Sequence, residues 1–156
     1  MLCACSSIDC PVQNTVAVNY GVMRSDGGEA VSDTLTDTLW VWTRRSDGTD
    51  TLILNRCNDK TIFQLPISYQ HPEDVLIFAM RDTALVWTLD TVWPKKDDIP
   101  HFESVDCSAH FFHHLTDVRC THSGIDSIVI HNPSVTYDPT VTNLYIYFRQ
   151  RPWLTE

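Results

Sequence analysis

Short stretches of apolar and polar residues, alternating or apolar on both faces, recur along the chain and predict β-strands. The clearest is a hairpin, in which Asp47-Gly48 supplies the positive-φ residues of a tight turn between two strands. Strands are predicted at Thr15–Val22, Asp37–Thr43, Asp50–Leu54, Thr61–Leu65, Val75–Met80, Ala84–Trp93, Phe102–Val105, Val118–Thr121, Ser127–His131 and Asn143–Phe148. Ten short strands separated by turn residues predict an all-β fold, a single immunoglobulin-like antiparallel β-sandwich.

One segment has a helical rather than a strand-like pattern. Ser108–Leu115 reads SAHFFHHL, with Asp106 or Ser108 available as the helix N-cap. It is too short to support a layer of the fold, so it predicts one helical turn across an end of the sandwich. Proline residues at positions 94 and 100 are expected to end strands.

Several predicted strands are apolar on both faces. Trp40 and Trp42 share one face because side chains alternate along a strand, and Leu39 and Val41 share the other. We expect such strands to lie centrally, with the second face covered by a loop or by the helical turn.

Composition narrows the class of protein. The chain has 156 residues, a length that suits one domain, and 20 acidic against 11 basic residues give it a net charge of −9. A nucleic-acid binder neutralises phosphates with clustered lysine and arginine, so this balance argues against a nucleic-acid partner. No apolar run approaches the roughly 20 residues of a membrane-spanning helix, which excludes a polytopic membrane protein.

The amino-terminal cysteines suggest a lipid anchor. Leu2-Cys3-Ala4-Cys5 has the shape of a bacterial lipobox, in which the thiol of the last cysteine is acylated and the chain is cut before it. We therefore expect residues 1–4 to be the remnant of a lipoprotein signal peptide, with its charged and apolar regions upstream. Residues 5–13 then form a lipid-proximal arm, residues 14–150 the sandwich and residues 151–156 a tail. The alternative is a fortuitous Cys-Ala-Cys sequence in a cytosolic protein.

The four remaining cysteines are an even number, and an oxidising compartment would permit three pairings among them. Cys10 and Cys107 both follow an apolar residue and an aspartate, and a bridge between them would tie the arm to the domain. It is the favoured pairing. A Cys57–Cys120 bridge is weaker, since either residue suits a small buried position.

Several stretches carry a family resemblance: CSSIDCP at 5–11, LPISYQHPEDVLIF at 65–78, PHFESVDC at 100–107, IDSIVIHNPSVTYD at 125–138 and NLYIYFR at 143–149. Together they resemble an uncharacterised family of Bacteroidetes envelope lipoproteins, known only as a domain of unknown function. The resemblance implies a small lipoprotein domain in the cell envelope and implies no activity. Residues 6–9 after Cys5 lack the acidic cluster that resembles a surface-export signal in this phylum, so we expect the protein at the outer membrane, facing the periplasm.

Six tripeptides resemble the acceptor motif for O-glycosylation of extracytoplasmic Bacteroidetes proteins. They are Asp33–Leu35, Asp37–Leu39, Asp50–Leu52, Asp82–Ala84, Asp90–Val92 and Asp126–Ile128. The same tripeptides are also explained without glycosylation, as an aspartate at the start of a β-strand followed by a β-branched or hydroxyl residue. Thr34, in a loop-like segment, is the one glycosylation candidate.

A histidine cluster raises the possibility of a metal site. His110, His113 and His114 lie within five residues of one another, and His110 would share a helical face with either of the others. Oxidised cysteines nearby cannot act as thiolate ligands, and no zinc knuckle is evident. We expect these histidines to face water or bond to the backbone while Phe111, Phe112 and Leu115 pack on the sandwich, and predict no metal and no cofactor.

Aromatic residues offer a second candidate surface. Trp40, Trp42, Trp87 and Trp93, with the ladder Tyr145/Tyr147, could form a stacking platform for a sugar or a peptide, although such residues are more often core. No nucleophile elbow, phosphate loop or acid–base carboxylate pair is present in the sequence, so no catalytic residue is predicted. The sequence thus favours a non-enzymatic envelope lipoprotein, a binding or assembly module. The alternatives are a glycan- or peptide-binding sandwich and a metal-dependent protein or enzyme.

Overall fold

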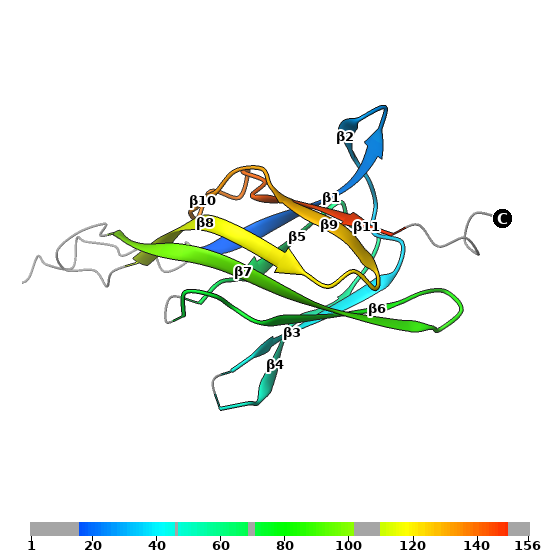
Figure 1. Cartoon of the computed structure of the whole chain (residues 1–156), viewed down its shortest axis with the longest axis horizontal. Helices are drawn as coiled ribbons and strands as arrows, with labels where there is room; N and C mark the ends of the chain where they lie inside the picture. The colour runs from blue at the N-terminus through cyan, green and yellow to red at the C-terminus, as the bar shows by residue number, and fades with distance from the viewer. Residues whose placement is uncertain (1–15, 46, 69–70, 102–109, 150–156) are drawn as a thin grey trace, which may run out of the picture.

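The computed structural model describes residues 16–45, 47–68, 71–101 and 110–149, and within them it contains eleven strands and no helix (Figure 1). The strands are β1 (Ala17–Asp26), β2 (Glu29–Ser32), β3 (Thr38–Arg44), β4 (Asp50–Cys57), β5 (Ile62–Pro66), β6 (Leu76–Arg81), β7 (Trp87–His101), β8 (His110–Cys120), β9 (Ile125–Ile130), β10 (Ser134–Val135) and β11 (Leu144–Phe148). The all-β prediction is confirmed.

The strands form two sheets. Sheet A has five strands, in the order β2-β1-β11-β9 with β5 beside β1, and sheet B has six, in the order β10-β8-β7-β6-β3-β4. β1 and β11 run parallel, pairing Tyr20 with Leu144 and Met23 with Tyr147. An entirely antiparallel sandwich was therefore the wrong expectation. Parallel neighbours need a long connection, and here nearly the whole chain separates the two strands.

The inner faces of the two sheets enclose one core. Tyr20 of sheet A stacks on Phe63 of the same sheet at a centroid distance of 5.0 Å, and its ring lies 6.1 Å from that of Phe78 in sheet B. Tyr20 and Phe78 are both fully buried. These rings show that the sheets pack face to face as a sandwich.

The predicted hairpin is confirmed in β3 and β4, with Gly48 at φ 87° in the turn and the Asp47 carboxylate accepting a hydrogen bond from the Thr49 amide at 2.9 Å. Two short strands, β2 and β10, were not predicted. The predicted strand at residues 102–105 lies outside the described residues.

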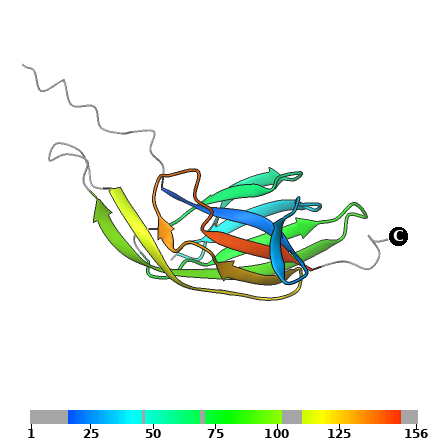
Figure 2. The same cartoon turned by 90° about the horizontal axis from the view of Figure 1, so that it is seen from above.

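The predicted helical turn is wrong. Residues 110–115 of that segment belong to β8, which pairs with β7 from His101↔His110 to Val92↔Cys120. The pair reaches beyond the other strands at the left of Figure 2. A run rich in aromatic residues suits either state locally, and the long ladder with β7 decides for the strand.

Proline does not end β7, contrary to expectation. The Pro94 carbonyl accepts a hydrogen bond from the Asp74 amide at 3.0 Å, on the edge of β7 that faces away from β8. In an extended strand the nitrogen and carbonyl of one residue point to the same side. The N–H that proline lacks would therefore also have pointed away from β8, so the ladder to β8 continues.

A buried carboxylate fixes the corner between the sheets. Asp90 of β7 is 2% exposed and accepts hydrogen bonds from the Thr121 hydroxyl at 2.5 Å and from three amides. The amides are those of Ser123 at 2.7 Å, Gly124 at 2.6 Å and Ile125 at 2.9 Å. These bonds hold the turn through which the chain passes from β8 in sheet B to β9 in sheet A.

Candidate functional site

Sheet B presents an aromatic outer face. Cross-strand partners lie on the same face of a sheet, and the register places Trp42 beside Ile77, Trp40 beside Ala79 and Trp87 beside Arg81. The alternate residues of these strands, including Leu39, Val41 and Phe78, are buried in the core. We call the outer surface formed by Trp40, Trp42, Trp87, Trp93, Arg81 and Arg119 the Trp face.

One end of the Trp face is a compact cluster of indoles and a guanidinium. The Trp40 and Trp87 rings lie 5.0 Å apart at an interplanar angle of 41°. The Arg81 guanidinium carbon lies 5.1 Å from the centroid of Trp40 and 5.5 Å from that of Trp87. Both distances are within the range of a cation–π contact. Ala79, on the same face, is only 3% exposed.

The other end repeats the stacking with one difference. The Arg119 guanidinium lies 4.8 Å from the Trp93 ring and also forms an ion pair with Glu73 at 3.2 Å. The ion pairs between described residues use Arg24, Arg44, Lys96, His113 and Arg119 as cations, and Arg81 is not among them.

Large apolar side chains remain in solvent on and beside this face. Trp87 is 50% exposed, Leu89 61% and Leu52 42%, and Leu85 at the tip of the β6–β7 turn is 68% exposed. The expectation that a loop or helical turn covers the second face of these strands is therefore wrong for the described residues. Several large exposed apolar side chains on and beside one face of a sheet are typical of an interaction surface.

The tyrosine ladder does not join the Trp face. Tyr145 and Tyr147 alternate with buried Leu144 and Ile146 on β11, which places the tyrosines on the outer side of sheet A. Tyr145 stacks on His131 with ring centroids 4.2 Å apart. The platform predicted from sequence therefore contains the four tryptophans without the tyrosines.

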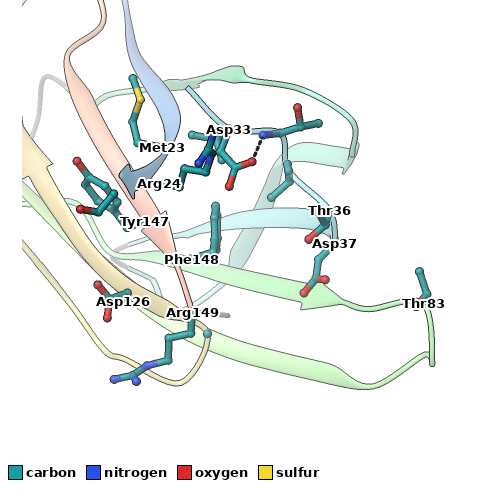
Figure 3. Close-up of a pocket in the computed structure, with 15 residues that line it drawn as sticks. Met23, Arg24, Asp33, Thr36, Asp37, Thr83, Asp126, Tyr147, Phe148 and Arg149 are labelled. Carbon is teal, nitrogen blue, oxygen red and sulfur yellow. Dashed lines mark hydrogen bonds between the residues drawn. The ribbon is translucent and has the colours of Figure 1, made fainter. Parts of the chain in front are cut away.

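A cavity of about 770 Å³ lies at one end of the sandwich, between the end of β1, the loop after β2 and the end of β11 (Figure 3). Thr34, which is exposed, lines this cavity, and its amide donates a hydrogen bond to the carboxylate of Asp33 at 2.8 Å. Its predicted loop position is confirmed, whereas its glycosylation stays a prediction. Thr83, from another of the six tripeptides, lines the same cavity and lies in the β6–β7 turn.

The cavity lining carries mixed charges. Asp33, Asp37 and Asp126 lie there with Arg24 and Arg149. Figure 3 shows the Phe148 side chain below Asp33, with Asp37 further to the right. No group of three or more histidine, cysteine or acidic side chains is placed to hold a metal ion anywhere in the described part of the chain.

A family model, "Family of unknown function (DUF6452)", matches residues 38–148. The chain belongs to the DUF6452 family. The matched region begins with β3 and ends with β11, so it includes every residue of the Trp face. No curated protein and no solved structure matches the chain.

The histidine cluster of this DUF6452 protein is split by its strand. His113 is 3% exposed and its Nδ1 lies 2.7 Å from Asp98 Oδ1, whereas His114, the next residue along β8, is exposed. The side chain of His110 is outside the described residues. The helical face that His110 was expected to share with His113 or His114 does not exist, because these residues lie in β8, where neighbouring side chains such as those of His113 and His114 point to opposite faces.

His113 does not face water, contrary to the expectation from the sequence, and belongs to a buried polar group. The Lys96 ammonium, which is fully buried, lies 3.2 Å from the same Asp98 carboxylate and donates a hydrogen bond to the His71 carbonyl. Burial lowers the pKa of His113, although the hydrogen bond and charge of Asp98 oppose that shift. Burial also raises the pKa of nearby Asp74. The arrangement satisfies buried charges and leaves no open ligand position on His113 Nδ1.

The described cysteines of the DUF6452 chain are not paired with each other. Cys57 and Cys120 are free thiols on β4 and β8, which are separated in sheet B by β7, β6 and β3. Four strand spacings amount to roughly 19 Å, far beyond the reach of a disulfide, so a Cys57–Cys120 bridge is wrong. Burial raises the pKa of both thiols. Cys5, Cys10 and Cys107 lie outside the described residues.

None of the described residues lies in a helix that is long and apolar enough to span a membrane.

Proposed function

We propose that this DUF6452 protein is a non-enzymatic binding module of the bacterial cell envelope, tethered through an acylated Cys5, which binds a glycan on the Trp face. The observation that carries the binding part is the exposure of Trp87 and Leu89 on a face that also holds Trp40 and Trp42. Side chains of this size are normally buried, so an uncovered group of them on one sheet supports a recognition surface.

A glycan is the ligand that the chemistry of this face favours. The electron-rich faces of indoles attract the weakly positive C–H groups on one side of a sugar ring, and a broad sheet offers several such faces in one surface. The guanidinium groups of Arg81 and Arg119 add hydrogen-bond donors for hydroxyl groups. A peptide, the other ligand considered from the sequence, would engage such a surface through apolar side chains.

The anchor is supported by the amino-terminal sequence. Leu2-Cys3-Ala4-Cys5 has the lipobox shape, and the stretches quoted above resemble Bacteroidetes envelope lipoproteins. A mature lipoprotein carries more than one acyl chain, which a durable anchor requires. We place the protein at the outer membrane, facing the periplasm, with a Cys10–Cys107 bridge between arm and domain.

The immunoglobulin-like type of the sandwich is part of the same proposal. The chain crosses between the sheets after β2, β4, β5 and β8, as well as on either side of β10. Repeated crossing of this kind is typical of the Greek-key connections in immunoglobulin-like sandwiches.

Binding is tested with the full chain against a glycan panel, followed by titration calorimetry of any hit. Trp42→Ala and Trp87→Ala should each weaken binding about tenfold or more, because each removes a stacking surface. Tyr147→Ala, on the outer side of sheet A, is the matched control and should bind as the parent does. If the protein binds peptides but no glycan, the glycan ligand is rejected and the proposal of a binding module survives.

The anchor is tested by incorporation of a labelled acyl chain into a protein expressed behind a complete lipoprotein signal peptide. Cys5→Ala should abolish labelling, whereas Cys3→Ala, two residues away, should leave it intact. Equal labelling of both variants would remove the anchor from the proposal. Thiol counting under non-reducing conditions tests the Cys10–Cys107 bridge in the same preparation.

A further inference from the structure

Arg81 is held in an unusual setting for a surface cation. Its guanidinium contacts the rings of both Trp40 and Trp87, at 5.1 and 5.5 Å, and it takes no part in the ion pairs among the described residues. The chain as a whole carries a net charge of −9 and has 20 acidic residues, yet the carboxylates in the ion pairs between described residues are bound to other cations.

We infer that the glycan bound on the Trp face is acidic, with a sugar carboxylate held by Arg81 while an adjoining sugar ring stacks on the exposed indole of Trp87. This inference rests on the proposed glycan-binding function and names its substrate class. A free carboxylate and a planar guanidinium match in geometry, since each can form two parallel hydrogen bonds to the other.

The molecule itself contains an example of the proposed arrangement. At the far end of the Trp face, Arg119 stacks on Trp93 at 4.8 Å and at the same time binds the carboxylate of Glu73 at 3.2 Å. Stacking on an indole therefore leaves the donors of a guanidinium available to a carboxylate. Arg81 has the stacking without a carboxylate in the ion pairs between described residues, and in this proposal the ligand supplies one.

Stacking also prepares Arg81 for binding. An arginine side chain in solvent loses considerable rotamer freedom when it binds, and contact with two rings removes part of that freedom in advance. The exposed apolar surface of Trp87 and Leu89 beside it displaces water and so weakens the screening of the charge. A carboxylate should therefore gain more here than at an arginine fully in water.

The test compares acidic oligosaccharides with their uncharged counterparts on the full chain. The probes are oligomers of galacturonate, glucuronate and mannuronate, each beside its methyl ester, which keeps the rings and removes the charge. We expect at least one acid to bind about tenfold more tightly than its ester, as charge-assisted hydrogen bonds imply. The preference should shrink as salt is raised, because an exposed charge pair is screened.

The variants separate Arg81 from the rest of the face. Arg81→Gln should abolish the preference for the acid, so that the affinities for acid and ester come to within about twofold of each other. Arg119→Gln, the matched control, removes a stacked arginine that already has Glu73 as its partner, and should keep the preference. Circular dichroism and the thermal midpoint check that both variants fold. The comparison of acid and ester on the parent chain needs no variant and stands if one fails to fold.

The outcomes distinguish the two proposals. Equal affinity for acids and esters, or a preference that Arg81→Gln leaves intact, overturns the acidic ligand while the glycan-binding function survives. Binding of neutral glycans alone has the same consequence. If no acid, no ester and no neutral glycan binds, both proposals are overturned. If acidic peptides bind in their place, the ligand of the Trp face is a protein and not a glycan.

Discussion

The charged groups on the two faces of sheet B have different surroundings. On the inner face, the Asp90 carboxylate is 2% exposed and has four hydrogen-bond donors around it. On the outer face, the Arg81 guanidinium lies against two indoles and outside the described ion pairs. Burial demands a partner for every polar group, so Asp90 is explained by folding. Folding makes no such demand at the surface, and the ligand recognition proposed above accounts for the arrangement of Arg81 and its tryptophans.

Removal of the inner charge should have the largest effect. Asp90→Ala leaves the buried amides of Gly124 and Ile125 without their acceptor, so we expect the free energy of unfolding to fall by about 4–6 kcal/mol. Urea denaturation measures the change. Asp117→Ala, an exposed carboxylate on β8, is the control and should cost less than about 0.5 kcal/mol. A similar small loss for both variants would contradict the structural role of Asp90.

A pair of aromatic truncations tests the two faces directly. Phe78→Ala in the core should lower the free energy of unfolding by about 3–5 kcal/mol, because it opens a cavity. Trp87→Ala, half-exposed on the Trp face, should cost only about 1 kcal/mol, mainly through lost contacts with Trp40 and Arg81. Denaturant unfolding of both variants gives the comparison. Equal losses would mean that the Trp face stabilises the fold as the core does.

The buried histidine on β8 should make stability depend on pH. Burial lowers the pKa of His113 in the folded protein, so the neutral form is favoured there. The free energy of unfolding should then be highest above the unfolded pKa of about 6.5 and fall as pH drops towards the lower folded pKa. Asp74 acts in the opposite sense, because its raised pKa favours the fold at low pH and that contribution is lost as pH rises through it.

Denaturant unfolding between about pH 5 and pH 8 measures this dependence. His113→Gln should flatten the decline on the acid side while the exposed His114→Gln leaves it unchanged. A decline of the same steepness in both variants would assign it to other groups.

The smallest effect is expected at the tip of the β6–β7 turn. Leu85 has φ 63°, in the left-handed region, where a leucine is strained and an asparagine is tolerated. Leu85→Asn should raise the free energy of unfolding by about 0.5–1 kcal/mol, seen as a higher thermal midpoint. Leu89→Asn is the control on a regular strand position and should give no gain. A loss at Leu85 would show that its apolar side chain contributes more than the strain costs.

Local chemistry made part of the fold predictable. Asp47-Gly48 marked the β3–β4 hairpin because a tight turn needs residues that accept positive φ, and Gly48 has φ 87°. The segment around His113 could not be assigned in the same way. Its aromatic run is compatible with a helical turn or a strand. Only the pairing with β7 makes it a strand, and no turn residue in the sequence indicates that pairing.

The candidate site was likewise predictable from the sequence only in part. The alternation of Trp40 and Trp42 with Leu39 and Val41 was readable from the sequence. That Trp87 lies against Trp40 was not, because β6 stands between their strands and contributes the small Ala79 beneath them. The pairing of Arg81 with this cluster has no sequence signal at all, since an arginine at the end of a strand is ordinary.

By itself, the sequence determined that this chain is all β and which side chains share a face within each strand, because alternation has a period of two residues wherever a strand forms. The tertiary structure alone decided which strands are neighbours, and which face of sheet B is buried against sheet A. Those choices depend on hydrogen-bonded ladders between residues far apart in the chain and on which of the two apolar faces of sheet B packs against sheet A. The face that does not pack against sheet A is the Trp face.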